Sequence, residues 1–373
     1  MTLAKRGTCL AGLAFVALLS GCSSVGTEPI GPAHHVEGGF RNTEITDPNK
    51  TFFHFLAMRA FGDTKWADHA ARAGEVPVTR LSPEKLDIGP DAPPQISWLG
   101  HSTFLIQVNG INILTDPIFS DRASPFSFSG PERYVPHVID YAKLPKIDYV
   151  VISHNHYDHL DDKAVEVLGD RPVYLVPLGL ADWFADEGVP RERVREFDWW
   201  DQAGFDHVTF QAMPSQHWSA RGLFDRRTTL WASWLMTFDE KKIWFAGDTG
   251  YNDKQFKEIG EKADGIDLAL IPIGAYAPRS FMKLYHVNPE EAVKLHRDIG
   301  AKKSIGMHWG TFPLTAEGPG DPVDELSRQR GLAGLTPDEF TTMVVGELRI
   351  LDSQTSGKEQ SAHLSPQLRV TAQ

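Results

Sequence analysis

A predicted strand that runs straight into a histidine-rich loop is the feature that most constrains this chain. Residues 148–153 have an apolar, β-branched centre, and the next six residues are His-Asn-His-Tyr-Asp-His. His154 and His156 stand two apart in an extended turn and can point at one metal ion, whereas Asp158 and His159 fall around the bend and can reach a second. Imidazole and carboxylate without thiolate suit zinc, with iron and manganese as alternatives. The fold must therefore present this loop at the end of a strand.

Three more candidate ligands stand where strands should end. His217, Asp248 and His308 each follow a short apolar run that is typical of a buried strand. Any one of them alone is more often structural. Three at successive strand ends, in chain order after the first loop, favour a shared site.

The pattern of strands and helices indicates an α/β fold. From about Pro94 strands alternate with short helices in two stretches, and the early strands of each stretch are too close together to have helices between them. This arrangement predicts a four-layer αββα sandwich whose two halves send loops to one edge. Strands are expected at 95–99, 103–108, 111–115, 148–153, 173–176, 207–213, 230–238, 242–246, 267–271 and 303–307, and helices near 178–187 and 289–298.

The main domain is predicted to span residues 94–352, with further segments on either side. Residues 22–50 are small, polar and proline-bearing, which predicts a flexible tether, and 353–373 form a polar tail. Residues 51–93 are a helical extension. Its segment 52–61 predicts a helix with apolar residues around most of its circumference. We expect it to be buried against the main domain; the alternative is a helix that presents aromatics to lipid or to an apolar substrate.

The first 22 residues resemble the signal of a bacterial lipoprotein. A short basic region precedes an apolar stretch that is too short to span a bilayer comfortably, and Leu-Ser-Gly-Cys at 19–22 resembles a lipobox. On that resemblance residues 1–21 are removed, lipid on Cys22 anchors the chain in the cell envelope, and Ser23 suggests the periplasmic face of the outer membrane. An ordinary secretory signal, cut at nearby small residues, is the alternative.

The net charge of the chain argues against nucleic acid as a partner, and its cysteine content argues against internal disulfides. The chain has a net charge of −12, and removal of Lys5 and Arg6 with the signal would make it −14. A chain this acidic, with no basic cluster in its sequence, is a poor general nucleic-acid binder. The mature chain's only cysteine would be Cys22, so no internal disulfide is expected.

Six strings around the candidate ligands carry a more specific resemblance. The ligand pattern resembles the metallo-β-lactamase superfamily, and the strings together resemble the N-acylphosphatidylethanolamine phospholipase D family and its bacterial relatives. The similarity covers roughly residues 94–350. The strings are Trp98–Thr103, Thr115–Ser120, Ser215–Trp218, Phe245–Tyr251, Ile271–Tyr276 and His308–Phe312.

By that resemblance seven residues are zinc ligands. One zinc is held by His154, His156 and His217, the other by Asp158, His159 and His308, and Asp248 bridges both. Two cations that share a carboxylate and a water lie about 3.5–4 Å apart and make that water acidic. The water would then attack phosphorus while the metals neutralise charge on the phosphoryl oxygens. Asp158, Asp248 and His286 are accordingly predicted to be catalytic.

Residues near the ligands have predicted supporting roles. Asp116 either fixes the tautomer of a ligand imidazole or simply forms a turn before Pro117. His101 is either a buried structural histidine or a residue that supports the ligands. His286, just before a helix with Asn288 as a plausible N-cap, is placed by the resemblance at the site mouth, where it could contact phosphate or assist the leaving group. An apolar substrate groove, or ordinary core packing, accounts for Tyr157, Trp218, Tyr276, Phe281 and Met282. His34 and His35 receive no role.

The leading hypothesis is a lipid-anchored, two-zinc phosphodiesterase. It would hydrolyse N-acyl-phosphatidylethanolamine or a related phospholipid to phosphatidic acid and an N-acylethanolamine. One string departs from the family, because the mammalian enzyme has a Gln-Tyr pair where this chain has Pro125-Phe126-Ser127-Phe128, and head-group selectivity is therefore open. The alternatives are a metal-dependent lactone or amide hydrolase and a non-catalytic envelope lipoprotein.

Overall fold

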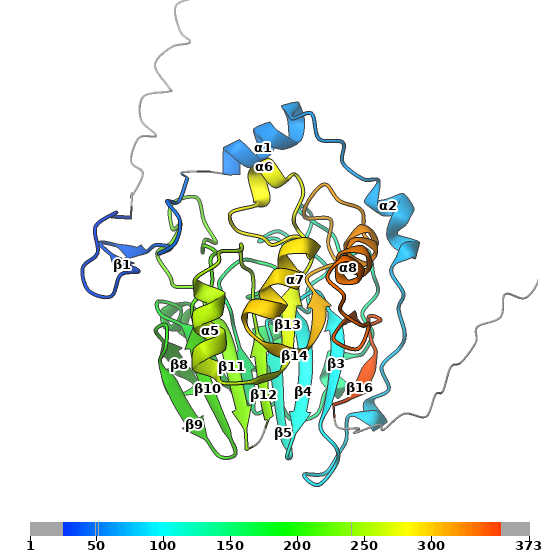
Figure 1. Ribbon diagram of the computed structural model, residues 1–373. Coiled ribbons are helices and arrows are strands. Elements are labelled where there is room, and N and C mark those ends of the chain that lie inside the picture. Colours follow the sequence, from blue (N-terminus) through cyan, green and yellow to red (C-terminus); the bar gives the residue numbers. More distant parts are fainter. Residues whose placement is uncertain (1–24, 49, 51, 240, 352–373) are drawn as a thin grey trace, which may run out of the picture.

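Two seven-stranded sheets form the centre of the molecule (Figure 1). The structure is a computed structural model that describes residues 25–48, 50, 52–239 and 241–351. The predicted signal peptide 1–21, its Cys22 and the predicted tail 353–373 lie outside the described residues. In the described part of the chain, no helix is both long and apolar enough to cross a bilayer.

The first sheet has the order β16-β3-β4-β5-β6-β7-β8. Its pairs from β16 to β5 are antiparallel and those from β5 to β8 are parallel. The strands are β3 (Gln95–Gly100), β4 (Thr103–Val108), β5 (Ile111–Thr115), β6 (Tyr149–Val151), β7 (Val173–Pro177), β8 (Val194–Phe197) and β16 (Leu348–Ile350).

The second sheet has the order β15-β14-β13-β12-β11-β10-β9 and repeats this plan. Its pairs from β9 to β12 are antiparallel, and those from β12 to β15 are parallel. The strands are β9 (Gln202–Phe205), β10 (Val208–Met213), β11 (Ser233–Phe238), β12 (Lys241–Phe245), β13 (Ile266–Pro272), β14 (Ala301–Met307) and β15 (Phe340–Thr342).

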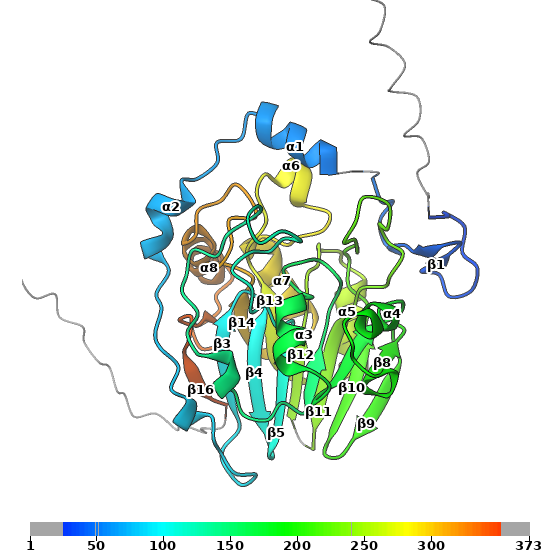
Figure 2. The ribbon, with the colours of Figure 1, turned by 180° about the vertical axis from the view of Figure 1, so that it is seen from behind.

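Helices cover the outer faces of both sheets. The second sheet carries α5 (Gln255–Ala263), α7 (Pro289–Asp298) and α8 (Asp321–Leu332), and Figure 2 shows α3 (Asp162–Leu168) and α4 (Ala181–Asp186) on the opposite face. Between the helical layers the sheets bury a large core that includes the fully buried tryptophans Trp98, Trp231, Trp234 and Trp244. The predicted four-layer αββα sandwich is therefore confirmed. The remaining short helices are α2 (His69–Arg72), α6 (Arg279–Met282), η1 (Ala73–Glu75), η2 (Pro83–Lys85), η3 (Tyr141–Lys143) and η4 (Arg191–Arg193).

Most predicted strands lie within two residues of their expected bounds, and two elements are shorter for identifiable reasons. The helix expected from 178 begins at Ala181, because the Glu196 carboxylate accepts the backbone N–H groups of Gly179 and Ala181 and holds a turn there. The strand expected from 230 begins at Ser233. The N–H groups of residues 230 and 232 bond to Leu178 and Ser153 of the other half instead of to a neighbouring strand.

The predicted flexible tether is wrong for residues 25–48. This segment forms a small hairpin, β1 (His35–Val36) with β2 (Gly39–Phe40), and packs on the main domain. The Nε2 atoms of His34 and His35 lie 2.6 and 2.8 Å from the two carboxylate oxygens of Asp198, and His34 also stacks on Trp199. These two histidines therefore fasten the N-terminal segment to the sandwich.

The helix predicted at 52–61 is present as α1 (Phe52–Phe61), but the expectation that it is buried is wrong. The side chains of Phe53, Leu56 and Phe61 are 70%, 42% and 88% exposed. One ring faces the protein, because Phe55 packs edge-on against Phe281 of α6 at 6.1 Å between ring centres. Figures 1 and 2 both show α1 above α6, at the end of the molecule towards which the parallel strands point.

Candidate metal centre

The predicted ligands meet at one edge of the sandwich, because the carboxyl ends of parallel strands share an edge. The His-rich loop follows β6, Asp248 follows β12 and His308 follows β14. His217 follows β10, which runs in the same direction as β12 because both strands are antiparallel to β11 between them. The backbone of His308 is left-handed, with φ at 63°, and its N–H donates to the carbonyl of His101, so the chain turns sharply where the strand ends.

Three histidines form one half of the centre, which we call site A (His154, His156 and His217). The Nε2 of His154 lies 2.8 Å from the Nδ1 of His156, and the Nε2 of His217 lies 3.3 Å from the same atom. All three nitrogens lie within 4.8 Å of one another. Three imidazole nitrogens that converge in this way match the ligand set of a tetrahedral metal with one open position.

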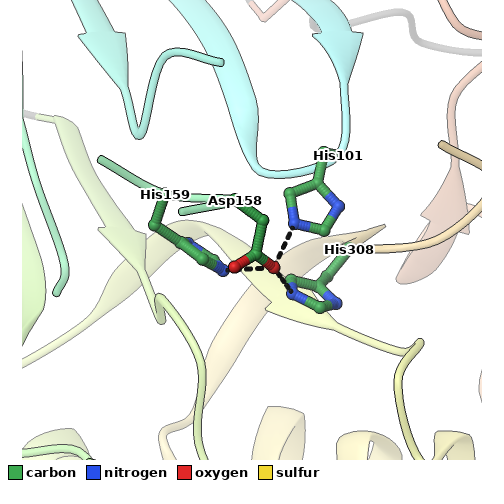
Figure 3. Close-up of side chains that lie close together, drawn as sticks. All are labelled: His101, Asp158, His159 and His308. Carbon is green, nitrogen blue, oxygen red and sulfur yellow. Dashed lines mark hydrogen bonds and ion pairs between the residues drawn. The ribbon is translucent and has the colours of Figure 1, made fainter. Parts of the chain in front are cut away.

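The other half is site B (Asp158, His159 and His308), shown in Figure 3. The Nε2 atoms of His159 and His308 each lie 3.4 Å from Oδ2 of Asp158. They also lie 3.2 and 3.1 Å from Oδ2 of Asp248, and that oxygen is 3.9 Å from the Nε2 of His217 in site A. Asp248 thus stands between the two sites, where a bridging carboxylate is needed.

Buried ligand atoms without hydrogen-bond partners show that this donor set fits metal ions. The Nε2 atoms of His159 and His308 and the Oδ1 of Asp248 are buried, and none makes a hydrogen bond. A buried polar atom without a partner costs roughly 1–3 kcal/mol. These three atoms, at site B and the carboxylate beside it, are explained if cations take the place of the missing partners, as imidazole and carboxylate ligands allow.

Asp116 contacts both sites, which agrees with the tautomer-fixing role rather than with a simple turn. Its carboxylate accepts the Nδ1–H of His159 at 2.6 Å and the backbone and hydroxyl of Ser153 at 2.7 and 2.5 Å. The Ser153 oxygen in turn lies 2.9 Å from Nδ1 of His154. One buried carboxylate can therefore keep the Nε2 of His159 and, through Ser153, that of His154 free of a proton and available to a metal.

His101 belongs to the centre and is not merely a core histidine. It is 1% exposed, its Nε2 lies 2.9 Å from Oδ2 of Asp158, and its ring centre is 4.0 Å from that of His308 (Figure 3). Its backbone is left-handed, with φ at 54°. An N–H donated to Asp158 holds the carboxylate of this predicted ligand in place.

The two sites differ in the charge of their imidazoles. In site A burial lowers the pKa of His156 and His217 to about 3, so both rings are neutral at pH 7. In site B burial would lower the pKa of His308, but the carboxylates of Asp248 and Asp158 outweigh it and raise the pKa to about 9. The pKa of His159 is likewise raised well above its usual value, since carboxylates outweigh burial. His308 is therefore protonated at pH 7, and a metal ion that binds its Nε2 would displace that proton.

His286 lies beside Asp248, where its predicted place at the site requires it to be. Its Nδ1 is 3.8 Å from Oδ2 of Asp248, its ring is 5.1 Å from that of His217, and its side chain is 11% exposed. Burial lowers the pKa of His286 to about 3, so the ring is neutral at pH 7. The carbonyl of His286 accepts a hydrogen bond from Arg279 at 2.7 Å, which fixes the end of the α6 turn.

The predicted groove residues do not all reach the centre. Trp218 packs edge-on against His156, with ring centres 4.3 Å apart. The Tyr157 hydroxyl instead donates to the carbonyl of Arg221. The structure places the others elsewhere: Phe281 contacts α1, Met282 supplies a carbonyl to the backbone of His286, and Tyr276 lines an outer cavity of about 360 Å³ beside α8.

Three residues that support the ligands were missed by the sequence analysis. The side-chain amide of Asn42 donates to the carbonyl of His217 at 2.8 Å. Asp47 accepts from the Tyr285 hydroxyl at 2.9 Å, and the Tyr285 carbonyl lies 2.9 Å from the Nδ1 of His217. Arg221 donates to two carbonyls of the His-rich loop. Their partners lie 61 to 238 residues away in the chain, and no local pattern signals such contacts.

Comparison with known proteins identifies the family. A family model described as a beta-lactamase superfamily domain matches residues 111–309, and N-acyl-phosphatidylethanolamine-hydrolyzing phospholipase D 1 of Caenorhabditis elegans is 42% identical over 68% of this chain and 74% of its own length. The chain belongs to the metallo-β-lactamase superfamily. Within the superfamily, a mitochondrial N-acyl-phosphatidylethanolamine-hydrolyzing phospholipase D of Saccharomyces cerevisiae is 37% identical over 64% of this chain and 52% of its own length. A metal-dependent hydrolase of Methanopyrus kandleri is 29% identical over 66% and 98%.

Two solved structures share the fold of this chain. A metallo hydrolase from Ignicoccus hospitalis covers 69% of this chain and 98% of its own, with a TM-score of 0.52 and 24% identity. An isothiocyanate hydrolase from Delia radicum gut bacteria covers 68% and 98%, with a TM-score of 0.56 and 18% identity. On the family model and the curated relatives, the protein is a metal-dependent hydrolase of this superfamily, with a candidate metal-binding cluster of histidine and aspartate.

Proposed function

We propose that the protein is a zinc-dependent phosphodiesterase of the phospholipase D type that hydrolyses N-acyl-phosphatidylethanolamine or a closely related phospholipid. The observation that carries this is the 42% identity to a relative named for that activity, over 74% of the relative's length. The side chains around the centre support it, because sites A and B, with Asp248 between them, offer five imidazoles and two carboxylates. Imidazole with carboxylate is the ligand set of catalytic zinc.

In this proposal each residue near the centre has its own role. When bound, two zinc ions supply Lewis acidity towards phosphoryl oxygens and lower the pKa of a water molecule. Asp248 spans both sites, and Asp116 holds the Nδ1 proton of His159 so that its Nε2 can act as a ligand. His101 orients Asp158. His286 is neutral at pH 7 and can donate one N–H to a phosphoryl oxygen or to the leaving group.

We also propose that the chain works at the cell envelope, anchored through lipid on Cys22. Only two residues separate Cys22 from Val25, where the described chain begins. At about 3.5 Å per residue this link is short. The hairpin that follows is fastened by His34 and His35 to Asp198. In place of a flexible tether, the anchor would then hold the folded body close to a membrane.

One assay separates this function from its alternatives. Zinc-loaded protein is offered N-acyl-phosphatidylethanolamine in mixed micelles, a chromogenic phosphodiester and an acyl-homoserine lactone. The proposal expects turnover of both phosphodiesters and loss of that turnover in Asp248→Asn. Asp267→Asn is the matched control, because Asp267 stands near the start of β13, where it pairs with Lys302 and accepts the backbone N–H of Lys242. Lactone turnover alone, or binding of two metals with no turnover, contradicts the proposal.

A further inference from the structure

All strongly exposed phenylalanines among the described residues lie on three segments. Phe53 and Phe61 belong to α1, Phe126 and Phe128 to the loop after β5, and Phe224 to the loop after β10, with exposed fractions between 55% and 88%. Leu56 and Leu223 on the same segments are 42% and 68% exposed. Single exposed apolar side chains are ordinary, but a cluster of them marks an interaction surface.

The three segments surround the mouth of the metal centre. On one side α1 rests on α6 through Phe55 and Phe281, and α6 leads directly into His286. Figures 1 and 2 show that α1 and α6 lie beyond the ends of the strands where the ligands gather.

Contacts to ligands place the other two segments. In the loop after β10, residues 219–228, the guanidinium of Arg226 lies 3.7 Å from the ring centre of Trp218, which packs on His156. The loop after β5, residues 121–133, ends at Arg133, whose guanidinium covers Phe312 at 4.9 Å. Phe312 in turn packs edge-on against His101. We call the four segments 50–65, 121–133, 219–228 and 276–286 the rim.

The rim is basic although the chain is acidic. Segments 50–65, 219–228 and 276–286 each carry two more basic than acidic residues, and 121–133 is balanced. By sequence the rim has a net charge of +6. Arg221, Arg227 and Arg279 pair with Asp162, Asp47 and Glu291 outside the rim, so the rim together with these partners carries +3 in a chain whose net charge is −12. The sequence shows no basic cluster because these residues are spread over more than 230 positions, and only the fold brings them to one end.

We propose that the rim is a docking surface for a lipid bilayer, with the exposed aromatic residues in the interfacial layer and the basic residues at the lipid phosphates. Aromatic and aliphatic side chains mixed with lysine and arginine are the composition that binds in this layer. A second copy of the chain fits this surface poorly, since a symmetric contact would bring together two rims that each carry +3 with their ion-pair partners included. The inference rests on the proposed function in that the docked lipid would reach the same centre, but docking needs no hydrolysis.

Fluorescent labels on the rim test this directly. The sequence contains only two native cysteines, Cys9 and Cys22. The single substitutions Phe61→Cys, Phe128→Cys and Phe224→Cys each add one thiol on the rim, and this thiol can carry an environment-sensitive dye. The control is Leu332→Cys on α8, an equally apolar position that is 72% exposed and outside the rim. The parent chain, labelled in the same way, corrects for the native cysteines. The vesicles contain phosphatidylcholine with phosphatidylglycerol and no N-acylated lipid.

The proposal expects blue-shifted emission at all three rim positions and quenching by nitroxide-labelled lipid, with neither change at position 332. The signal should grow with the phosphatidylglycerol content and shrink with added salt, because surface charges are screened. Dyes that stay in water in the presence of vesicles overturn the proposal. It is also overturned if the rim dyes become shielded without lipid as protein concentration rises, which would identify a second copy as the occupant. A lipid anchor does not mimic docking, since the position 332 control carries the same N-terminus.

Discussion

Asp116 offers the sharpest test of how the protein prepares its metal ligands, because one buried carboxylate contacts both sites. The substitution Asp116→Asn keeps the size of the side chain and one oxygen acceptor. That oxygen can still accept the backbone N–H of Ser153, which lies 2.7 Å away. The new amide nitrogen, however, faces the Nδ1–H of His159 at the position where an oxygen 2.6 Å away now accepts it. Two donors cannot pair, so His159 must lose its partner or change tautomer.

The expected losses in the free energy of unfolding and in metal affinity can both be given a size. A hydrogen bond to a charged group contributes about 1.5–3 kcal/mol to the free energy of unfolding, and Asp116 is fully buried. Removal of a partner that orients a metal ligand lowers metal affinity roughly 10–100-fold. At about 1.4 kcal/mol per factor of ten, the loss in binding free energy is about 1.4–2.8 kcal/mol. Site B should lose affinity through His159, and site A through the Ser153 contact to His154.

The assay is a competitive zinc titration against a chromophoric chelator, with thermal unfolding measured in parallel. Ser153→Ala should weaken site A alone, since only His154 depends on that hydroxyl. Asp161→Asn is the matched control: this carboxylate accepts the backbone N–H groups of Phe119 and Ser120 and touches no ligand. It should lower stability by a similar amount without changing zinc affinity. Unchanged zinc affinity in Asp116→Asn refutes the reasoning.

Two further predictions concern the His-rich loop and proton release. Arg221→Lys should lower the free energy of unfolding by about 2–3 kcal/mol, because lysine cannot reach both the Asn155 and Leu160 carbonyls that the guanidinium binds, and chemical denaturation checks this. No loss would show that the loop holds itself. At pH 7 zinc should release protons on entering site B but not site A, because His308 has a pKa of about 9 whereas His156 and His217 have pKa values of about 3. Lowering the pH should therefore weaken site B about tenfold per unit for each proton released, while site A stays constant between pH 7 and 5. Calorimetry in buffers of different ionisation enthalpy measures this, and equal proton release at both sites contradicts it.

The sequence was sufficient to predict which ligands lie together wherever a residue's place along a strand decides its place in the fold. His154, Asp248 and His308 could be placed together because each follows a strand of a sheet whose parallel strands end at one edge. The roles of Asn42, Asp47 and Arg221 could not be predicted, since each depends on the packing of segments far apart in the chain.

The predictions for residues 25–48 and for the burial of the helix at 52–61 were wrong for the same physical reason. Residues 25–48 have the composition of a tether, yet specific contacts such as those of His34 and His35 with Asp198 fix them on the body. The helix at 52–61 has the composition of a buried helix, yet Phe53 and Phe61 face solvent. Composition reports which residues can be buried, and only the assembled surface shows whether there is a partner to bury them.

The most direct test of the central claim, attack of water on phosphorus, is to find which product carries the oxygen atom taken from water. Zinc-loaded protein is incubated with N-acyl-phosphatidylethanolamine in water enriched in oxygen-18, and the products are analysed by mass spectrometry. The proposed function predicts one labelled oxygen in the phosphate of phosphatidic acid, none in the acyl carbonyl groups, and an unlabelled N-acylethanolamine. A label in a carboxylate would show that the centre attacks carbonyl carbon, and would contradict the assignment as a phosphodiesterase.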